Sequence, residues 1–465
     1  MHFMRSESNR PRISRILPMS LLLLCLCTGC GEHPASADAM TSEEVTAFEE
    51  VTASEEVTAS EEATTSGDSD HRDMDPPADM HSVEEIFVNP PSLRLVMVGD
   101  VLLHTPVEKS ALQENGSYHY DALFSQTAER IRSADIALVN QEVILGGEDL
   151  GVSGYPAFNA PFSVADALSD AGFDMICHAT NHALDKGKKG LLACIDNWQT
   201  THPEIAVLGI HDREETAENR VLLCQVSPAD SAGDPEGENR AVRWGLAGDS
   251  GITDTTETLT IAFLNYTYGT NGIALPDNMP YAVDLLDEEM VLADISLAEE
   301  LADFTVVCPH WGTEYRLTPD AYQQRWSNLF LENGVDLVIG THPHVIEPVE
   351  MLTDDSGHRM LVYYSLGNYV NWTSSEGDGI ANRMVGGMAD VTISLDDSGN
   401  AVIEDYGVDA LVAHLTPGVN GVTTYFLSDY TEELAAKNAI IAQDPHFSLP
   451  YCIDLCDSVW GDLWQ

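Results

Sequence analysis

Basic residues are scarce in this chain. Of its 465 residues only 21 are Lys or Arg, against 76 Asp or Glu, which gives a formal net charge of -55 at pH 7. A protein that binds nucleic acid by neutralising phosphates needs a basic surface, so nucleic acid is excluded as a partner. The same charge argues against an electrostatic grip on anionic lipid and is typical of a soluble, salt-tolerant or extracellular protein.

Long apolar runs are absent after the first thirty residues. Before that point, several arginines precede an apolar stretch at 16–27, and the sequence CTGC follows at 27–30. The stretch is too short to span a membrane comfortably, and its flanks are typical of an export signal. We expect residues 1–30 to be a lipoprotein-type signal peptide, because CTGC resembles a bacterial lipoprotein box in which Cys30 carries the lipid. Ordinary cleavage with release of the chain is the alternative.

Cysteine pairs of the kind that bind structural zinc are also absent beyond position 30. No two of the later cysteines have the spacing Cys-x-x-Cys. Cys177 and Cys308 lie in apolar runs and are expected to be buried thiols. Cys452 and Cys456 could form a disulfide in an exported protein, but their spacing alone does not decide this.

Residues 31–90 contain almost no aromatic residues. The segment 41–66 repeats the unit EEVTAS, and the segment 68–79 continues acidic. Such a composition cannot bury enough apolar surface to order itself, and repulsion between like charges keeps it extended. We therefore expect a disordered acidic stalk that tethers the membrane anchor to a folded domain.

From residue 91 onward, short apolar runs alternate with amphipathic segments. The pattern predicts strands at 93–98, 135–140, 174–177, 259–264, 305–308, 335–339 and 361–364. It predicts helices at 121–133, 162–171, 188–199, 288–301 and 321–333. This alternation is typical of an α/β layered domain, which we expect to cover residues 91–415, with 416–465 as an extension that packs on it.

Two further segments have patterns of their own. The polar, Gly- and Asp-rich stretch 230–254 is expected to be a surface insertion between strands. The sequence DSGN at 397–400, between two alternating segments, predicts a β-hairpin.

Polar clusters follow directly on most of the predicted strands. They are Asp100, Asn140 to Glu142, His178 to His182, His310, and His342 to His344, and a further polar cluster, SLGN, lies at 365–368. Functional groups in open α/β sheets collect beyond the carboxyl ends of the strands, so these clusters should converge on one edge. Carboxylates, an amide and imidazoles together form a ligand set that suits one or two transition-metal ions.

The clusters provide candidates for separate roles at such a centre. The proposed metal ligands are Asp100, Glu142, Asn181, His310, His342 and His344. The imidazoles of the His-x-His pair can reach one face of an extended segment together. Two carboxylates against two dications leave positive charge that attracts a phosphate.

His182 is the candidate catalytic residue, placed to contact a substrate oxygen as a proton donor. Asp185 could orient its imidazole, or it could serve only as a carboxylate at a helix N-terminus. His104 could join the ligands or support them, and Glu314 is a further candidate ligand. Trp311, Gly312, Glu314 and Tyr315 are expected to support the site, with Gly312 allowing close backbone approach and Trp311 and Tyr315 forming the pocket wall.

Several segments in one order resemble the bacterial CapA family, which is linked to capsule and poly-γ-glutamate synthesis and whose domain is similar to the calcineurin-like metallophosphoesterases. They are LVMVGDVLLH, LVNQE, FNAP, LSDAGFDMICHATNHALDKG, LNYTYGTNGI, VVCPHWGTEY, VDLVIGTHPHVIEPVE and VYYSLGNYV, within residues 93–372. The resemblance implies a metallophosphatase-like layered sandwich of two mixed sheets flanked by helices. It places the six proposed ligands at metal-site positions and His182 at the catalytic-histidine position. Leu102 stands where phosphoesterases usually have the His of Asp-x-His.

Two functions fit this sequence. The first is an extracytoplasmic, membrane-anchored hydrolase that uses two divalent ions (Mn, Fe or Zn) on a phosphoester, or an amide, in capsular-polymer metabolism. The second is a non-catalytic scaffold that holds or exports a poly-γ-glutamate-like polymer beside a synthase complex. For that role, Lys186, Lys188 and Lys189 form a local basic cluster. A surface adhesion module is a third possibility without a motif of its own.

Overall fold

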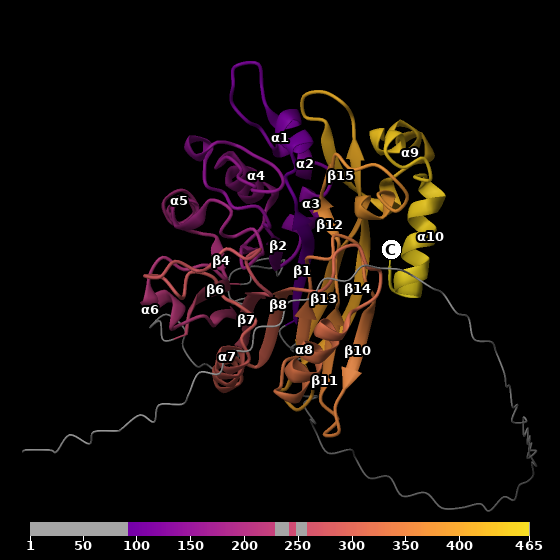
Figure 1. The fold of residues 1–465 in the computed structure, drawn as a ribbon. Coiled ribbons are helices and arrows are strands. Elements are labelled where there is room, and N and C mark those ends of the chain that lie inside the picture. The colour runs from indigo at the N-terminus through magenta and orange to yellow at the C-terminus, as the bar shows by residue number, and fades with distance from the viewer. Residues whose placement is uncertain (1–91, 228–240, 248–257, 465) are drawn as a thin grey trace, which may run out of the picture. The chain divides into compact units, whose positions relative to one another are not determined.

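The computed structural model describes residues 92–227, 241–247 and 258–464 (Figure 1). All of them belong to one of the two units into which the chain divides, Glu84–Gln465. The expected signal peptide and acidic stalk, residues 1–90, lie outside the described residues. Within the described ranges, no helix combines the length and apolar character needed to cross a bilayer.

An eight-stranded sheet forms one layer of the fold. Its strands are β1 (Ser92–Val101), β2 (Ile136–Asn140), β3 (Met175–Cys177), β4 (Ala206–Leu208), β12 (Asn368–Val370), β13 (Val385–Leu395), β14 (Ala401–Leu415) and β15 (Val422–Phe426). The order is β15-β14-β13-β1-β2-β3-β4, and β12 pairs with the last residues of β1, beyond those that pair with β13. The strands from β1 to β4 are parallel, whereas β1, β13, β14 and β15 pair antiparallel.

A seven-stranded sheet forms the second layer. Its strands are β5 (Leu222–Ser227), β6 (Ala241–Leu246), β7 (Leu259–Thr267), β8 (Phe304–His310), β9 (Leu337–Ile339), β10 (Val349–Thr353) and β11 (Arg359–Tyr363). The order is β10-β11-β9-β8-β7-β5-β6, with a parallel centre and antiparallel edges. The sheets touch where Cys308 Sγ of β8 lies 3.7 Å from Met97 Sδ of β1. The expected sandwich of two mixed sheets with helices is confirmed.

Helices occupy the connections between the parallel strands, as βαβ crossovers require. They are α1 (Thr105–Ala111), α2 (Asp121–Phe124), α3 (Ala128–Arg132), α4 (Ser163–Ala171), α5 (Gly187–Thr201), α7 (Glu288–Leu301) and α8 (Ala321–Glu332). Of the other helices, α6 (Glu214–Ala217) lies between β4 and β5, and α9 (Glu432–Lys437) and α10 (Leu449–Trp460) follow β15. In Figure 1, α7 and α8 lie beside the second sheet. Their buried residues join the outward-facing residues of β7 and β8 in a hydrophobic cluster separate from the main core. Both faces of that sheet are therefore covered, which explains its near-continuous apolar strands.

The helix predicted at 121–133 is wrong in one respect, because the chain forms two short helices there, α2 and α3. Ser125 Oγ donates to the carbonyl of Ala122 at 3.2 Å, and Thr127 Oγ1 donates to the carbonyl of Phe124 at 3.1 Å. Such local side-chain bonds offer the backbone an alternative to continuous helical hydrogen bonding.

The stretch 230–254 is not simply an insertion. Its described part contains β6, which pairs antiparallel with β5 at the edge of the second sheet. The hairpin predicted around 397–400 is present between β13 and β14. Residues 416–465 supply the edge strand β15 of the first sheet, and Trp460 Nε1 donates to the carbonyl of Glu347 at 2.9 Å.

The described cysteines are all buried free thiols. This includes Cys177 and Cys308, as expected, and also Cys452 and Cys456, which lie on α10 and form no disulfide with each other.

Candidate metal centre

Asp100 reaches the site because β1 ends in a close backbone contact. Its backbone N–H donates to the carbonyl of Gly367 at 2.9 Å. A Cβ atom on the preceding Gly99 would lie only 1.9 Å from the same carbonyl oxygen, so no larger residue fits there. Asn140, the last residue of β2, fixes the Asp100 carboxylate by donating from Nδ2 to Oδ1 at 2.8 Å.

Glu142 lies two residues beyond β2, fully buried among imidazoles. Its Oε1 is 3.6 Å from His344 Nε2 and 3.9 Å from His310 Nε2. Neither of its carboxylate oxygens has a hydrogen-bond partner among the described residues. Burial raises the pKa of this carboxyl well above its usual value, and Asp100 raises it further. A buried carboxylate without donors is costly, and a bound cation would compensate it.

The three histidines proposed as ligands come from the second sheet and the loop after β9. His310 ends β8, and His342 and His344 lie in the loop after β9. His344 Nδ1 is 3.1 Å from Asp100 Oδ2. His342 Nδ1 is buried and has no hydrogen-bond partner among the described residues, which leaves it free to bind a metal.

The backbone of the His-x-His segment differs from the extended segment we expected. His342 has φ 100° and His344 has φ 58°, both in the left-handed region. Residues with a Cβ seldom adopt this conformation, and it costs on the order of 1–3 kcal/mol when they do. Both imidazoles face the centre because of this turn and not because of a shared face of a strand.

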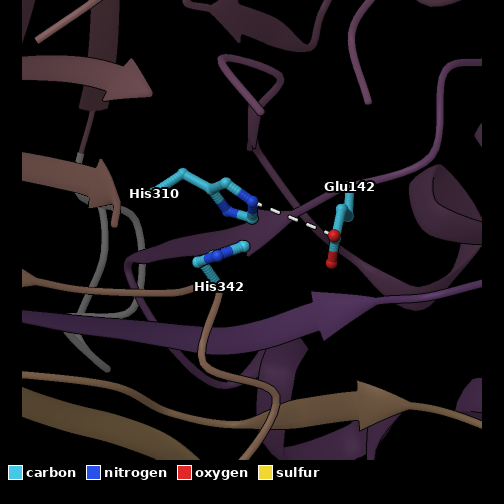
Figure 2. Close-up of side chains that lie close together, drawn as sticks. All are labelled: Glu142, His310 and His342. Atoms are coloured by element: carbon cyan, nitrogen blue, oxygen red, sulfur yellow. Dashed lines mark ion pairs between the residues drawn. The ribbon is translucent and has the colours of Figure 1, made fainter. Parts of the chain in front are cut away.

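The carboxylates and imidazoles at the site form two overlapping groups of potential metal ligands. Within each group, one donor atom from each side chain lies within 4.8 Å of the others. Glu142, His310 and His342 form the first group, and Figure 2 shows them facing one another. Asp100, Glu142 and His344 form the second. Glu142 belongs to both groups, and carboxylates with imidazoles are side chains that suit a divalent metal ion.

The protonation of the imidazoles follows from their surroundings. Burial lowers the pKa of His310 and of His342 well below the usual value, and the neighbouring imidazoles lower it further. Burial also lowers the pKa of His344, but Glu142 and Asp100 outweigh it and raise that pKa to about 9. The first group therefore presents two neutral imidazoles, the form that binds metals.

Asn181 lies beside the first group. Its Oδ1 is 3.0 Å from His310 Nε2, and its Nδ2 donates to the hydroxyl of Tyr268 at 3.3 Å. The ring of Tyr268 in turn lies against His342, with centroids 4.7 Å apart. The amide oxygen therefore points at a ligand imidazole, within the same cluster of polar groups.

His182 and Asp185 are in direct contact. His182 Nδ1 lies 2.7 Å from Asp185 Oδ2, and that oxygen also accepts from the backbone N–H of Phe158 at 2.7 Å. The other ring nitrogen, Nε2, lies 3.9 Å from Glu142 Oε1. The Phe158 ring meets the imidazole edge-on at 4.6 Å. The carboxylate thus fixes the ring so that Nε2 faces the centre.

A cavity of about 620 Å³ opens beside the centre, and His182 and His344 form part of its wall. His104 also lines it, and burial followed by the nearby His344 and His182 lowers the pKa of His104 to about 3. Glu314 and Tyr315 are exposed and line the same cavity. The cavity lining does not include the lysines at 186, 188 and 189.

Trp311 and Gly312 support the site from behind. Trp311 is buried and donates from Nε1 to the carbonyl of Tyr364 at 3.0 Å. Gly312 has φ 94° and packs against the Gln323 side chain. They are therefore supporting residues and do not line the cavity.

Sequence reasoning missed several residues that the structure places at the site. They are Tyr268, Asn271, Thr341 and Arg383. Thr341 follows a strand-like run, as the proposed ligands do, so position alone could have indicated it. Arg383 lies in a short 3₁₀ turn, for which the sequence contains no comparable signal.

Fold and site together define a two-sheet α/β protein with a buried carboxylate–imidazole centre. The chain belongs to the bacterial capsule synthesis protein family PGA_cap, whose profile matches residues 94–230 and 247–373. The resemblance inferred from the sequence is therefore confirmed.

Curated proteins similar to this chain include two with related names. The "PGA biosynthesis protein CapA" of Bacillus subtilis (strain 168) is 25% identical over 293 residues, which cover 59% of this chain and 63% of that protein. The "Capsule biosynthesis protein CapA" of Bacillus anthracis is 23% identical over 323 residues, which cover 67% and 66%. The match thus covers slightly less than two thirds of either relative.

Solved structures similar to this chain include two nucleotidases. The NAD nucleotidase NadN of Haemophilus influenzae aligns over 81% of this chain and 64% of its own, with a TM-score of 0.38 and 12% identity. A putative 5'-nucleotidase from Staphylococcus aureus, in complex with alpha-ketoglutarate, aligns over 68% and 54%, with a TM-score of 0.37 and 16% identity.

Proposed function

We propose that this protein is a metal-dependent phosphoester hydrolase that acts in capsular-polymer metabolism. One observation carries the proposal: the buried Glu142 carboxylate has no hydrogen-bond donor among the described residues and belongs to both groups of potential ligands. Carboxylates and imidazoles suit manganese, iron or zinc. Two such ions would polarise a phosphate oxygen and activate water.

The residues of the chain would supply the remaining steps. Glu142 and the four carboxylate and imidazole side chains around it would hold the ions, and Asn181 would contribute its amide oxygen. His182 presents Nε2 toward the centre and donates a proton to the leaving-group oxygen. Asp185 keeps the imidazole in that orientation through its 2.7 Å contact with Nδ1. The cavity beside His182 holds the rest of the substrate.

Metal content and phosphatase activity test this proposal together. Purified protein should contain one or two equivalents of manganese, iron or zinc by elemental analysis and should hydrolyse members of a phosphoester panel. Asp100→Ala and His342→Ala should lose metal and activity while their circular dichroism spectra stay unchanged. A chain that cannot be loaded with any of these metals would rule the hydrolase out.

A non-catalytic scaffold for a polyglutamate-like polymer is the second candidate. It is favoured by Leu102, an apolar residue in the cavity wall at the position where phosphoesterases usually have a histidine. The relatives named for PGA and capsule biosynthesis agree with either role. The candidates differ in cells, because Asp100→Ala together with His342→Ala should leave polymer production intact if the protein only organises a synthase complex.

The site of action is part of the proposal. A lipid on Cys30 would hold the protein at the outer face of the cytoplasmic membrane, as the sequence of residues 1–30 suggests. Labelling cells with a radioactive fatty acid should mark the wild type and a Cys452→Ser control but not Cys30→Ser. Release of unlabelled wild-type protein into the medium would instead indicate secretion.

A further inference from the structure

Arg383 is a cation without an anion beside the metal centre. It lies in the 3₁₀ turn Ala381–Met384 and is the only lysine or arginine among the described residues that line the 620 Å³ cavity. Its Nε is buried and has no hydrogen-bond partner among the described residues. Glu314, the only carboxylate among those lining residues, is exposed and forms no ion pair with Arg383. The guanidinium is therefore available for a ligand.

The side chain is held in place by contacts that leave its donors free. The guanidinium carbon lies 3.5 Å from the centroid of the Tyr315 ring, and this cation–π contact orients the guanidinium group. The backbone carbonyl accepts from Asn368 Nδ2 at 3.0 Å and from Asn371 Nδ2 at 3.4 Å. Asn368 Oδ1 also lies 3.2 Å from His344 Nδ1, so the Asn368 side chain connects Arg383 to the loop after β9 that carries His344.

The chemistry of the cavity limits what Arg383 can bind. A guanidinium recognises carboxylates and phosphates through paired hydrogen bonds. The chain carries a formal charge of -55, so an anionic group needs a local cation to enter. Thr373, Ser374 and Ser375 line the same cavity, so hydroxyl groups are available nearby to complete the polar contacts.

We infer that Arg383 binds a second anionic group of the substrate, a carboxylate or a phosphate, apart from the group that reaches the metal centre. This inference rests on the proposed function for the position of the first group. The substrate class is thus a molecule with two anionic groups, such as a phosphoester that also carries a carboxylate. Arg383 would determine specificity and would take no part in bond cleavage.

Binding of non-hydrolysable probes to the metal-loaded full chain tests this inference. The probes are ethylphosphonate, with one anionic group, and two series of increasing spacer length: ω-phosphonocarboxylates and α,ω-diphosphonates. Calorimetry should show that at least one two-group probe binds the wild type about 10- to 100-fold more tightly than ethylphosphonate, the range expected for a charge-assisted pair. The series that shows the gain identifies the second group as a carboxylate or a phosphate.

Arg383→Gln should abolish this gain and leave ethylphosphonate binding unchanged, and Arg383→Lys should retain part of it. Arg325→Gln is the matched control, because Arg325 also stacks on an aromatic ring, Trp326, but lies outside the cavity. If no two-group probe gains affinity, or if the gain survives in Arg383→Gln, the inference is wrong. This test separates the inference from the proposed function. If the protein hydrolyses no phosphoester but still binds a two-group probe more tightly through Arg383, only the hydrolase proposal is refuted. If it hydrolyses phosphoesters without an Arg383-dependent gain in affinity, only the role of Arg383 is refuted.

Discussion

Replacing Glu142 with glutamine should stabilise the metal-free protein and abolish its response to metal. In the wild type, the carboxylate is buried without donors, and burial raises its pKa well above the usual value. Burying a carboxyl group without hydrogen-bond donors costs about 1–3 kcal/mol, and the His344 imidazole 3.6 Å away offsets only part of this cost. Glutamine has nearly the same shape and no charge, so in the presence of a chelator Glu142→Gln should unfold at a higher temperature. For a unit of this size, the gain is about 1 °C per kcal/mol.

Bound metal should make the wild type more stable than Glu142→Gln. A ligand that binds only the folded state adds about 2.7 kcal/mol of stability when its free concentration is roughly 100 times Kd. The wild type should gain this stability, since Glu142 contributes to both groups of ligands. Glu142→Gln should gain almost none, because the amide cannot neutralise either cation. The two melting curves should therefore exchange places between chelator and excess manganese or zinc.

Differential scanning calorimetry with and without metal measures this exchange, and elemental analysis gives the bound equivalents. Glu347→Gln is the matched control, because Glu347 is also fully buried but accepts a hydrogen bond from Gln323 and lies outside both groups. It should keep the metal response of the wild type. Equal metal content and affinity in Glu142→Gln and the wild type would refute the shared-carboxylate centre.

Three other substitutions give separate tests. Burial raises the pKa of Glu108 to about 8, so wild-type stability should fall by about 1.4 kcal/mol per pH unit between pH 4.5 and 8, and denaturant titrations of Glu108→Gln should lack this slope. Asp185→Asn should lower kcat about 10- to 100-fold with little change in KM on an active phosphoester, because it misorients His182. His342→Gly should be more stable than His342→Ala in urea titrations.

The position of the site could be predicted from the sequence because it depends on where strands end. Asp100, Glu142 and His310 follow apolar runs, and parallel strands bring their carboxyl ends to one edge. Strands with weak patterns were missed: β4 has only three residues, and the residues of β10 are all partly or fully exposed. The hairpin around 397–400 was found because its turn residues are distinctive.

Features that depend on tertiary contacts had no sequence signal. The sharing of Glu142 between two groups requires β1, β2 and the second sheet to meet. Arg383 is separated by many residues from every proposed ligand and reaches the cavity only because the chain between β12 and β13 folds back along it. Periodicity describes one element at a time, so it cannot reveal residues brought together by several elements.

The left-handed backbone of His342 is a tertiary feature at a residue that the sequence already indicated as a ligand. The stabilities of its glycine and alanine variants measure what this conformation costs. Both variants remove the imidazole, so in the folded state they differ mainly in the cost of φ 100° for a residue with a Cβ. Glycine adopts this φ freely, and alanine should be less stable by about 1–2 kcal/mol. Glycine also gains unfolded-state entropy, which reduces the difference by less than about 1 kcal/mol. Equal stabilities, or a more stable alanine variant, would mean that the loop relaxes and that no strain is held at the metal centre.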